Sequence, residues 1–172
     1  MKFINKALVA AAFATAAVTA TAQEQFIPAL SYRVGPYAAG GSGFFGGVID
    51  YLSLLNAQGG INGVKMTWEE CETEYNATRG VECYERLKKS RGGATMVEPL
   101  STGIAYGLLD RVAQDKIPMT TLGYGRSDAA DGRVFPYVFP LITSYWSQAA
   151  GMMKYIGKKE GGLDKLKGKK IT

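Results

Sequence analysis

Residues 92–127 read GGATMVEPLSTGIAYGLLDRVAQDKIPMTTLGYGRS, and this stretch decides the fold. The short apolar runs at 94–97 and 117–122 have the composition of buried strands. Between them, apolar residues recur at 105, 108, 109 and 112, which is the spacing of one helix face. We therefore predict strand, helix, strand: a βαβ unit with parallel strands. Ligands of such sheets bind at the carboxyl ends of the strands, here the loops 99–103 and 123–127.

The flanking sequence continues the same alternation of strands and helices. Strands are predicted at 26–34, 64–70 and 134–140, and helices at 44–55, 77–89 and after 144. The strand 64–70 alternates apolar and polar residues, so we expect it at or near a sheet edge. The small residues 37–43 are predicted to form a loop. Together the elements predict an α/β fold with a doubly wound parallel sheet.

The last predicted helix is expected to be capped by Thr143 or Ser144 and to end at 160–162. Its apolar residues Ala149, Met152, Met153 and Ile156 are expected to be buried. Residues 170–172 resemble the beginning of a strand. We therefore expect the chain to be the N-terminal part of a longer protein.

Residues 1–22 have the features of a secretory signal peptide. Lys2 and Lys6 precede a stretch of small apolar residues, and Ala20-Thr21-Ala22 fits the small-x-small cleavage rule. The apolar stretch is too short to span a bilayer. We predict cleavage after Ala22, which leaves residues 23–172 as an exported, periplasmic domain.

Composition excludes several classes of function. The 172 residues are 47% hydrophobic, as expected of a folded domain. The net charge of +5 is small and scattered, so no nucleic-acid partner is expected. There is no histidine, the commonest general base and a common metal ligand, and no G-x-S-x-G motif. We expect neither an enzyme nor a metal or other cofactor.

The two cysteines, Cys71 and Cys83, are predicted to form a disulfide, because an exported protein folds in an oxidising compartment. Two buried thiols are the alternative. The glutamates at 69, 70, 72 and 74 are predicted to lie on a solvated face rather than in a calcium site, since the stretch lacks the turn glycine of a calcium loop.

Ser101 and Thr102 are the strongest candidates for a binding site. They follow a predicted strand and begin a helix, where hydroxyls and backbone N–H groups favour an anion such as a carboxylate. Plain helix capping is the alternative. Tyr37, Tyr124 and Tyr145 fall on the same side of the sheet and are candidates to wall the apolar part of a ligand, although each such residue alone more often serves in packing.

Three segments in order carry a family resemblance: YRVGPY at 32–37, NAQGGING at 56–63 and PLST at 99–102. With the leader, they resemble the leucine/isoleucine/valine-binding branch of the type I periplasmic substrate-binding proteins, which serve ATP-driven (ABC) importers. The resemblance covers residues 26–172. It implies two doubly wound lobes that close on a small-molecule ligand, a membrane permease as partner, and no catalysis. This chain would supply the N-terminal lobe and lack the second.

The same resemblance implies site roles. Ser101 and Thr102 would hold the ligand carboxylate, Gly123 and Tyr124 would meet its amino group or side chain, and Tyr37 would lie at the mouth of the cleft. The loop at 123–126, GYGR, differs from the small loop of the leucine binders. A branched-chain amino acid, an aromatic acid, an amide and another carboxylate therefore stay open as ligands. A ligand-sensing protein on the same fold, without a permease, is the alternative function.

Overall fold

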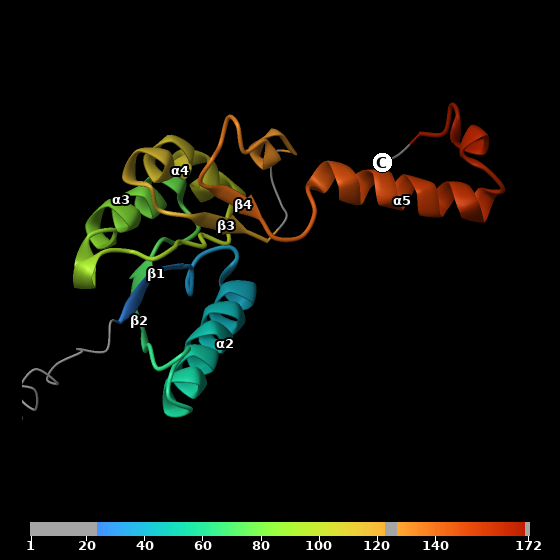
Figure 1. Ribbon diagram of the computed structural model, residues 1–172. Helices are drawn as coiled ribbons and strands as arrows, with labels where there is room; N and C mark the ends of the chain where they lie inside the picture. The colour runs from blue at the N-terminus through green and yellow to red at the C-terminus, as the bar shows by residue number, and fades with distance from the viewer. Residues whose placement is uncertain (1–23, 123–126, 171–172) are drawn as a thin grey trace, which may run out of the picture.

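The computed structural model describes residues 24–122 and 127–170 (Figure 1). The predicted leader and the candidates Gly123 and Tyr124 lie outside these residues. The helices and strands are β1 Gln25–Ser31, α2 Ala38–Ala57, β2 Met66–Glu72, α3 Ala77–Leu87, α4 Thr102–Asp115, β3 Met119–Thr121, β4 Val138–Pro140 and α5 Tyr145–Glu160, with short 3-10 turns η1 Ser90–Gly92, η2 Ser127–Ala130 and η3 Leu163–Leu166.

The strands are parallel, as predicted. β1 pairs with β2 and β3 pairs with β4. The predicted strand at 94–97 joins the two pairs through single bridges, from Ala94 to Phe26 and from Val97 to Met119. The order across the sheet is therefore β2, β1, 94–97, β3, β4. The predicted edge strand, β2, lies at one end of this order.

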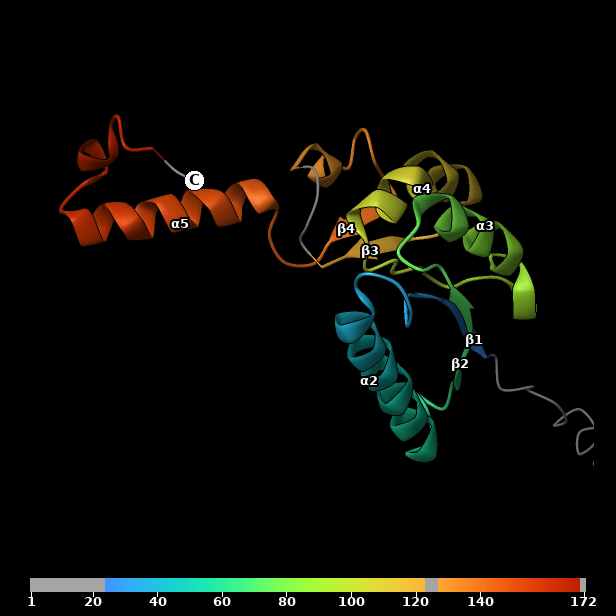
Figure 2. The ribbon, with the colours of Figure 1, turned by 180° about the vertical axis from the view of Figure 1, so that it is seen from behind.

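Helices cover both faces of the sheet, which confirms the doubly wound α/β fold. Figures 1 and 2 show α3 and α4 on one face and α2 on the other. The face under α3 and α4 holds the main core, where fully buried Tyr84, Leu108 and Val112 pack with Leu30 and Met119 of the strands. These helices lie where the apolar spacing predicts them.

α2 begins six residues earlier than predicted, because the small-residue segment is helical from Ala38. The reason is a close approach at Gly41. A Cβ on Gly41 would lie 2.1 Å from the carbonyl oxygen of Tyr32 and 2.3 Å from its ring. Only glycine lets the helix pack this tightly on the end of β1, so tertiary packing outweighs the low helix propensity of the segment.

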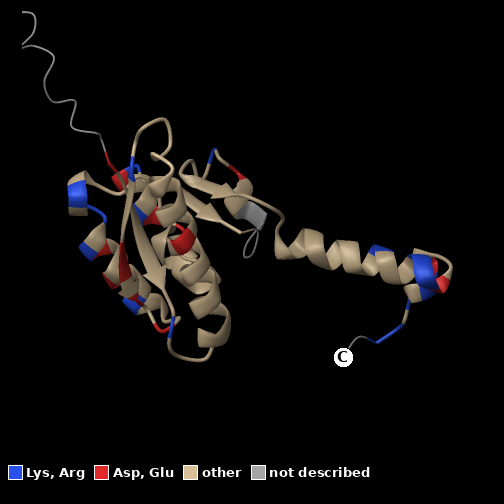
Figure 3. Cartoon of the chain, turned by 90° about the horizontal axis from the view of Figure 1, so that it is seen from below, with Lys and Arg blue, Asp and Glu red and all other residues tan. Residues whose placement is uncertain are grey.

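α5 has the predicted caps but not the predicted burial. The Ser144 hydroxyl accepts a hydrogen bond from the Ser147 N–H at 3.3 Å, and Gly161 ends the helix with φ of 90°. The prediction of a buried apolar face is wrong: Met152 is 61% and Ile156 43% exposed. The start of α5 borders the two cavities described below, the rest of the helix extends away from the sheet, and η3 folds back onto it (Figures 1 and 3). The apolar periodicity indicates the face, but no described sheet lies beneath it.

The disulfide between Cys71 and Cys83 is confirmed, with Cα atoms 5.7 Å apart, and it ties the end of β2 to α3. No helix in the described part of the chain is long and apolar enough to cross a membrane. Among the same residues, no cluster of three or more histidine, cysteine or acidic side chains is placed to hold a metal ion.

Candidate ligand-binding site

Ser101 and Thr102, the predicted binding residues at the start of α4, have different roles. Ser101 is 1% exposed, and its hydroxyl accepts a hydrogen bond from the Ile104 N–H at 3.3 Å, so it caps the helix. Thr102, the first residue of α4, lines two cavities at the carboxyl end of the sheet. Capping therefore accounts for Ser101, whereas Thr102 remains available at a cavity wall.

The first cavity, which we call the tyrosine cavity, has a volume of about 300 Å³. Segments that follow β1 and β2 meet there with α2, the α4 start and the α5 start. Its lining residues are Tyr32, Gly40, Phe44, Tyr75, Leu100, Thr102 and Tyr145. None of these side chains is charged.

Tyr32 forms the fixed side of the tyrosine cavity. Its hydroxyl donates a hydrogen bond to the Leu100 carbonyl oxygen at 3.1 Å, and the residue is 7% exposed. The ring meets those of Phe45 and Tyr75 edge-on, at centroid distances of 5.4 and 4.9 Å. Burial raises the pKa of Tyr32, with smaller contributions from Tyr75 and Glu98, so the hydroxyl stays protonated and keeps donating.

The backbone of Tyr75 has a left-handed conformation with φ of 61°, which is uncommon for a residue with a large side chain. Its N–H donates to the hydroxyl of buried Thr73 at 3.2 Å. On its other side lies the Tyr37 ring, 4.2 Å away between centroids. Tyr37 is 57% exposed and contacts Tyr75 without being one of the residues that line the cavity.

The turn before α4 is held by Glu98. One carboxylate oxygen accepts the Leu100 N–H at 2.8 Å and the other accepts the Thr120 hydroxyl at 3.1 Å. Leu100 takes a left-handed conformation with φ of 45°. This turn connects β3 to the α4 start and presents the Leu100 carbonyl to Tyr32.

The residue after Tyr32, Arg33, forms a polar clamp. The Arg33 guanidinium binds both carboxylate oxygens of Glu70, at 2.6 and 2.9 Å, and donates to the Ser42 carbonyl at 3.2 Å. The Arg33 N–H donates to Glu72 at 2.7 Å. The hydrogen bond from Arg33 lowers the pKa of Glu70. The clamp ties the segment after β1 to β2 and to the second turn of α2, and it engages two of the glutamates predicted to lie on a solvated face.

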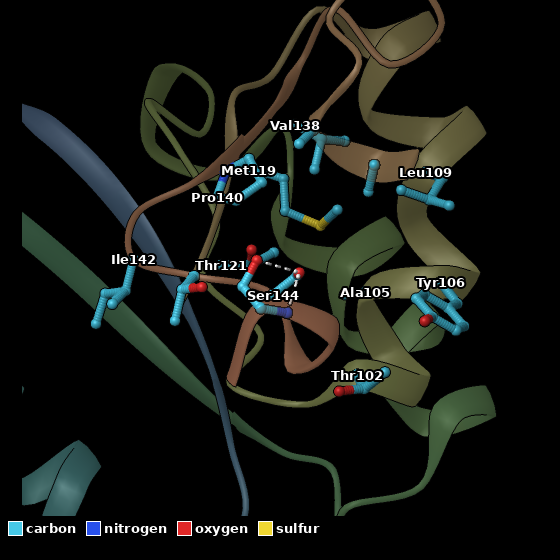
Figure 4. Close-up of a pocket in the computed structure, with 14 residues that line it drawn as sticks. Thr102, Ala105, Tyr106, Leu109, Met119, Thr121, Val138, Pro140, Ile142 and Ser144 are labelled. Atoms are coloured by element: carbon cyan, nitrogen blue, oxygen red, sulfur yellow. Dashed lines mark hydrogen bonds between the residues drawn. The ribbon is translucent and has the colours of Figure 1, made fainter. Parts of the chain in front are cut away.

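The second cavity lies between α4 and β4 and has a volume of about 450 Å³ (Figure 4). One wall is apolar, with Leu109, Met119 and Val138, and the other carries the hydroxyls of Thr121 and Ser144. Thr102 borders this cavity as well. Both cavities therefore open at the carboxyl ends of the strands, which is the predicted edge.

The sequence-predicted candidates are only partly brought together. Thr102 and Tyr145 line the tyrosine cavity, whereas Ser101 is buried as the helix cap and Tyr37 packs on Tyr75. Sequence reasoning missed Tyr32 and Tyr75, although each follows a strand, β1 and β2 respectively. The rule that ligands gather at carboxyl ends would have found both, had it been applied to every strand rather than to the central unit.

Residues 24–171 match the model of the periplasmic binding protein family. No curated protein matches the sequence. The crystal structure of an ABC transporter permease from the Pseudomonas fluorescens group is 49% identical, with a TM-score of 0.75, and the match covers 86% of this chain and 36% of that chain.

Two more distant structures share the fold. An ABC transporter solute-binding protein from R. palustris in complex with 4-hydroxybenzoate is 16% identical, with a TM-score of 0.63 and coverage of 80% of this chain and 36% of that one. LivJ from Streptococcus pneumoniae, a branched-chain amino acid transporter substrate-binding protein in complex with isoleucine, is 16% identical, with a TM-score of 0.60 and coverage of 70% and 34%.

This chain thus spans about a third of the length of the structures it matches. A share of that size, with parallel strands and helices on both faces, corresponds to one lobe of the type I binding-protein fold. The chain belongs to the periplasmic binding protein family, a family of binding proteins and not of enzymes.

Proposed function

We propose that residues 23–172 form the N-terminal lobe of the solute-binding protein of an ABC importer, which captures a small carboxylate for transport. The observation that carries the proposal is the position of Thr102. It begins α4, and it borders a tyrosine-lined cavity at the carboxyl end of the sheet. The 49% identity to an ABC transporter protein supports the transport role.

A carboxylate suits this position for two reasons. The first turn of a helix carries N–H groups without intrahelical acceptors, and the helix dipole favours negative charge there. The Thr102 hydroxyl adds a donor at the same place. The ligands of two structures with this fold, isoleucine and 4-hydroxybenzoate, both carry a carboxylate. The sequence resemblance to the leucine/isoleucine/valine-binding branch also supports an amino acid or a related acid.

The proposal includes the remaining predicted features. Residues 1–22 would direct export to the periplasm, with cleavage after Ala22. Gly123 and Tyr124 would add ligand contacts and Tyr37 would lie at the mouth of the cleft. A second lobe would close on the ligand, and a membrane permease would receive it.

The test is Thr102→Ala in the complete protein. A hydrogen bond to a charged group contributes about 1.5–3 kcal/mol, and loss of about 1.4 kcal/mol is tenfold in affinity. We expect the Kd of the ligand found by a thermal-shift screen to rise at least tenfold in calorimetry.

The matched control is Thr78→Ala, because Thr78 is an exposed threonine in the first turn of α3. The control should bind like the wild type. An unchanged Kd in Thr102→Ala would rule out the carboxylate contact.

A further inference from the structure

We propose that the tyrosine cavity holds the ring of an aromatic carboxylate, and that Gly40 provides the space for that ring. The inference rests on the proposed function and names its ligand class. It is drawn from the chemistry of the lining, from the rigidity of the walls and from the open space at Gly40.

The lining is aromatic on several sides. Tyr32, Phe44, Tyr75 and Tyr145 come from four separate places in the sequence and border one cavity of about 300 Å³. Aromatic rings pair with one another in edge-to-face or offset geometry and gain energy beyond simple burial. A ligand ring entering this cavity would find such partners, whereas an aliphatic chain would gain only the burial of its surface.

Two of these walls are held in place before any ligand arrives. Tyr32 is buried and bonded to the Leu100 carbonyl. Tyr75 lies edge-on to Tyr32 and rests on Tyr37. Prearranged walls lower the ordering cost of binding and favour a flat, rigid ligand that fits them without rearrangement.

The polar groups along the cavity fit an acid at one end of such a ring. Among the described residues that line the cavity there is no acidic side chain, so the ammonium group of an amino acid would find no counter-charge among them. The Thr102 hydroxyl and the start of α4 lie at its border. This arrangement favours a carboxylate attached to an aromatic ring.

Gly40 lies where a larger side chain would reduce the size of the tyrosine cavity. It lines the cavity, and a Cβ built on it meets nothing within 4 Å. Its neighbour Gly41 is required for packing, but Gly40 is not. Glycine within a helix costs about 0.5–1 kcal/mol relative to alanine. The missing side chain therefore brings no benefit to the helix and leaves the cavity open.

The test uses Gly40→Leu in the complete protein, with Gly43→Leu as the control. Gly43 lies on the same helix, is exposed, and also has nothing within 4 Å of a built Cβ, but it does not line the cavity. Calorimetry with benzoate, 4-hydroxybenzoate and phenylacetate is compared with cyclohexanecarboxylate and isoleucine. Benzoate and cyclohexanecarboxylate share a carboxylate and a six-membered ring but differ in aromaticity.

We expect at least one aromatic acid to bind at least tenfold more tightly than cyclohexanecarboxylate and isoleucine. Gly40→Leu should weaken that binding at least tenfold without lowering the Tm, and Gly43→Leu should leave it unchanged. Equal or tighter binding of isoleucine or cyclohexanecarboxylate would overturn the aromatic assignment. If that binding remained sensitive to Thr102→Ala, the receptor function would stand. Wild-type affinity in Gly40→Leu would overturn the role of Gly40. A panel in which no aromatic acid binds would overturn the aromatic assignment alone, because the receptor function is tested separately by the thermal-shift screen and by Thr102→Ala.

Discussion

Two adjacent hydroxyl residues at the start of α4 face different surroundings, and their variants should separate stability from binding. Ser101 is buried as a helix cap, so Ser101→Ala should lower the free energy of unfolding by about 1 kcal/mol. Urea denaturation measures this change. Ser53→Ala is the control, since that exposed hydroxyl bonds only within α2, to the Ile49 carbonyl. Unchanged stability in Ser101→Ala would show that the cap contributes nothing.

At the level of single residues, the sequence predicted some positions and could not predict others. The pair of hydroxyls before a helix and the pair of cysteines in an exported chain are local or compositional signals. Tyr75 gives no such signal, because its role depends on a left-handed backbone and on contact with Tyr32, 43 positions away in the sequence. Leu100 is similar: its conformation follows from bonds to Glu98 and Tyr32 rather than from its own preference.

Among the elements, α2 offers a direct comparison of two glycines. Gly41→Ala places a Cβ against the Tyr32 carbonyl and ring, so we expect destabilisation of at least about 1–3 kcal/mol from overpacking. Gly47→Ala meets nothing and should stabilise the helix by about 0.5–1 kcal/mol. Thermal unfolding of both variants tests the pair. A similar Tm for the two would contradict the close packing of α2 on β1.

The central helices and the parallel strands were predictable because their apolar residues contact each other within one βαβ unit or its neighbours. The start of α2 was not, since glycine-rich sequence predicts a loop unless the packing partner is known. For α5 the helix itself was predicted, but its burial was not predicted correctly. Its apolar face is present in the sequence, but the sequence does not state what covers it, and no described sheet does.

At the scale of the whole molecule, the disulfide should stabilise the protein by restricting the conformations of the unfolded chain. Cys71 and Cys83 are separated by 12 positions. Closing a loop of this length removes unfolded-state entropy equivalent to about 3 kcal/mol in the chain-entropy model. We expect Cys71→Ser with Cys83→Ser to lose about that much stability in denaturant unfolding. A reductant should destabilise the wild type equally and leave the double variant unchanged, whereas an equal effect on both would rule out the link.

The free energy of unfolding should also depend on pH, through the carboxylate of Asp115. This carboxylate accepts hydrogen bonds from the Lys88 ammonium at 2.8 Å and the Tyr84 hydroxyl at 2.9 Å, which join α3 to α4. Burial raises the pKa of Asp115, but these two bonds outweigh it, and the pKa lies below its ordinary 3.8. Because the folded-state pKa is lowered, the stabilisation is present above the unfolded-state pKa and is lost as pH falls through the folded-state value.

Asp115→Asn should therefore reduce stability at pH 7 by about 1–3 kcal/mol and flatten its decline in acid. Urea midpoints between pH 7 and pH 2 measure both effects. Asp110→Asn, an exposed position on the same helix, should change neither. An acid profile for Asp115→Asn that parallels the wild type would contradict the assignment.

The position of Trp146 gives this protein a built-in optical probe. Trp146 is 73% exposed and follows directly after Tyr145 of the tyrosine cavity. Indole fluorescence shifts to shorter wavelength when the ring leaves water. Any event that covers the start of α5 should therefore shift the emission maximum of Trp146 to shorter wavelength. The sequence holds only one other tryptophan, Trp68 in β2, at the far edge of the sheet. A Trp68→Phe variant would carry a single tryptophan, next to the cavity, and selective excitation of this indole would follow ligand capture in real time without any attached dye.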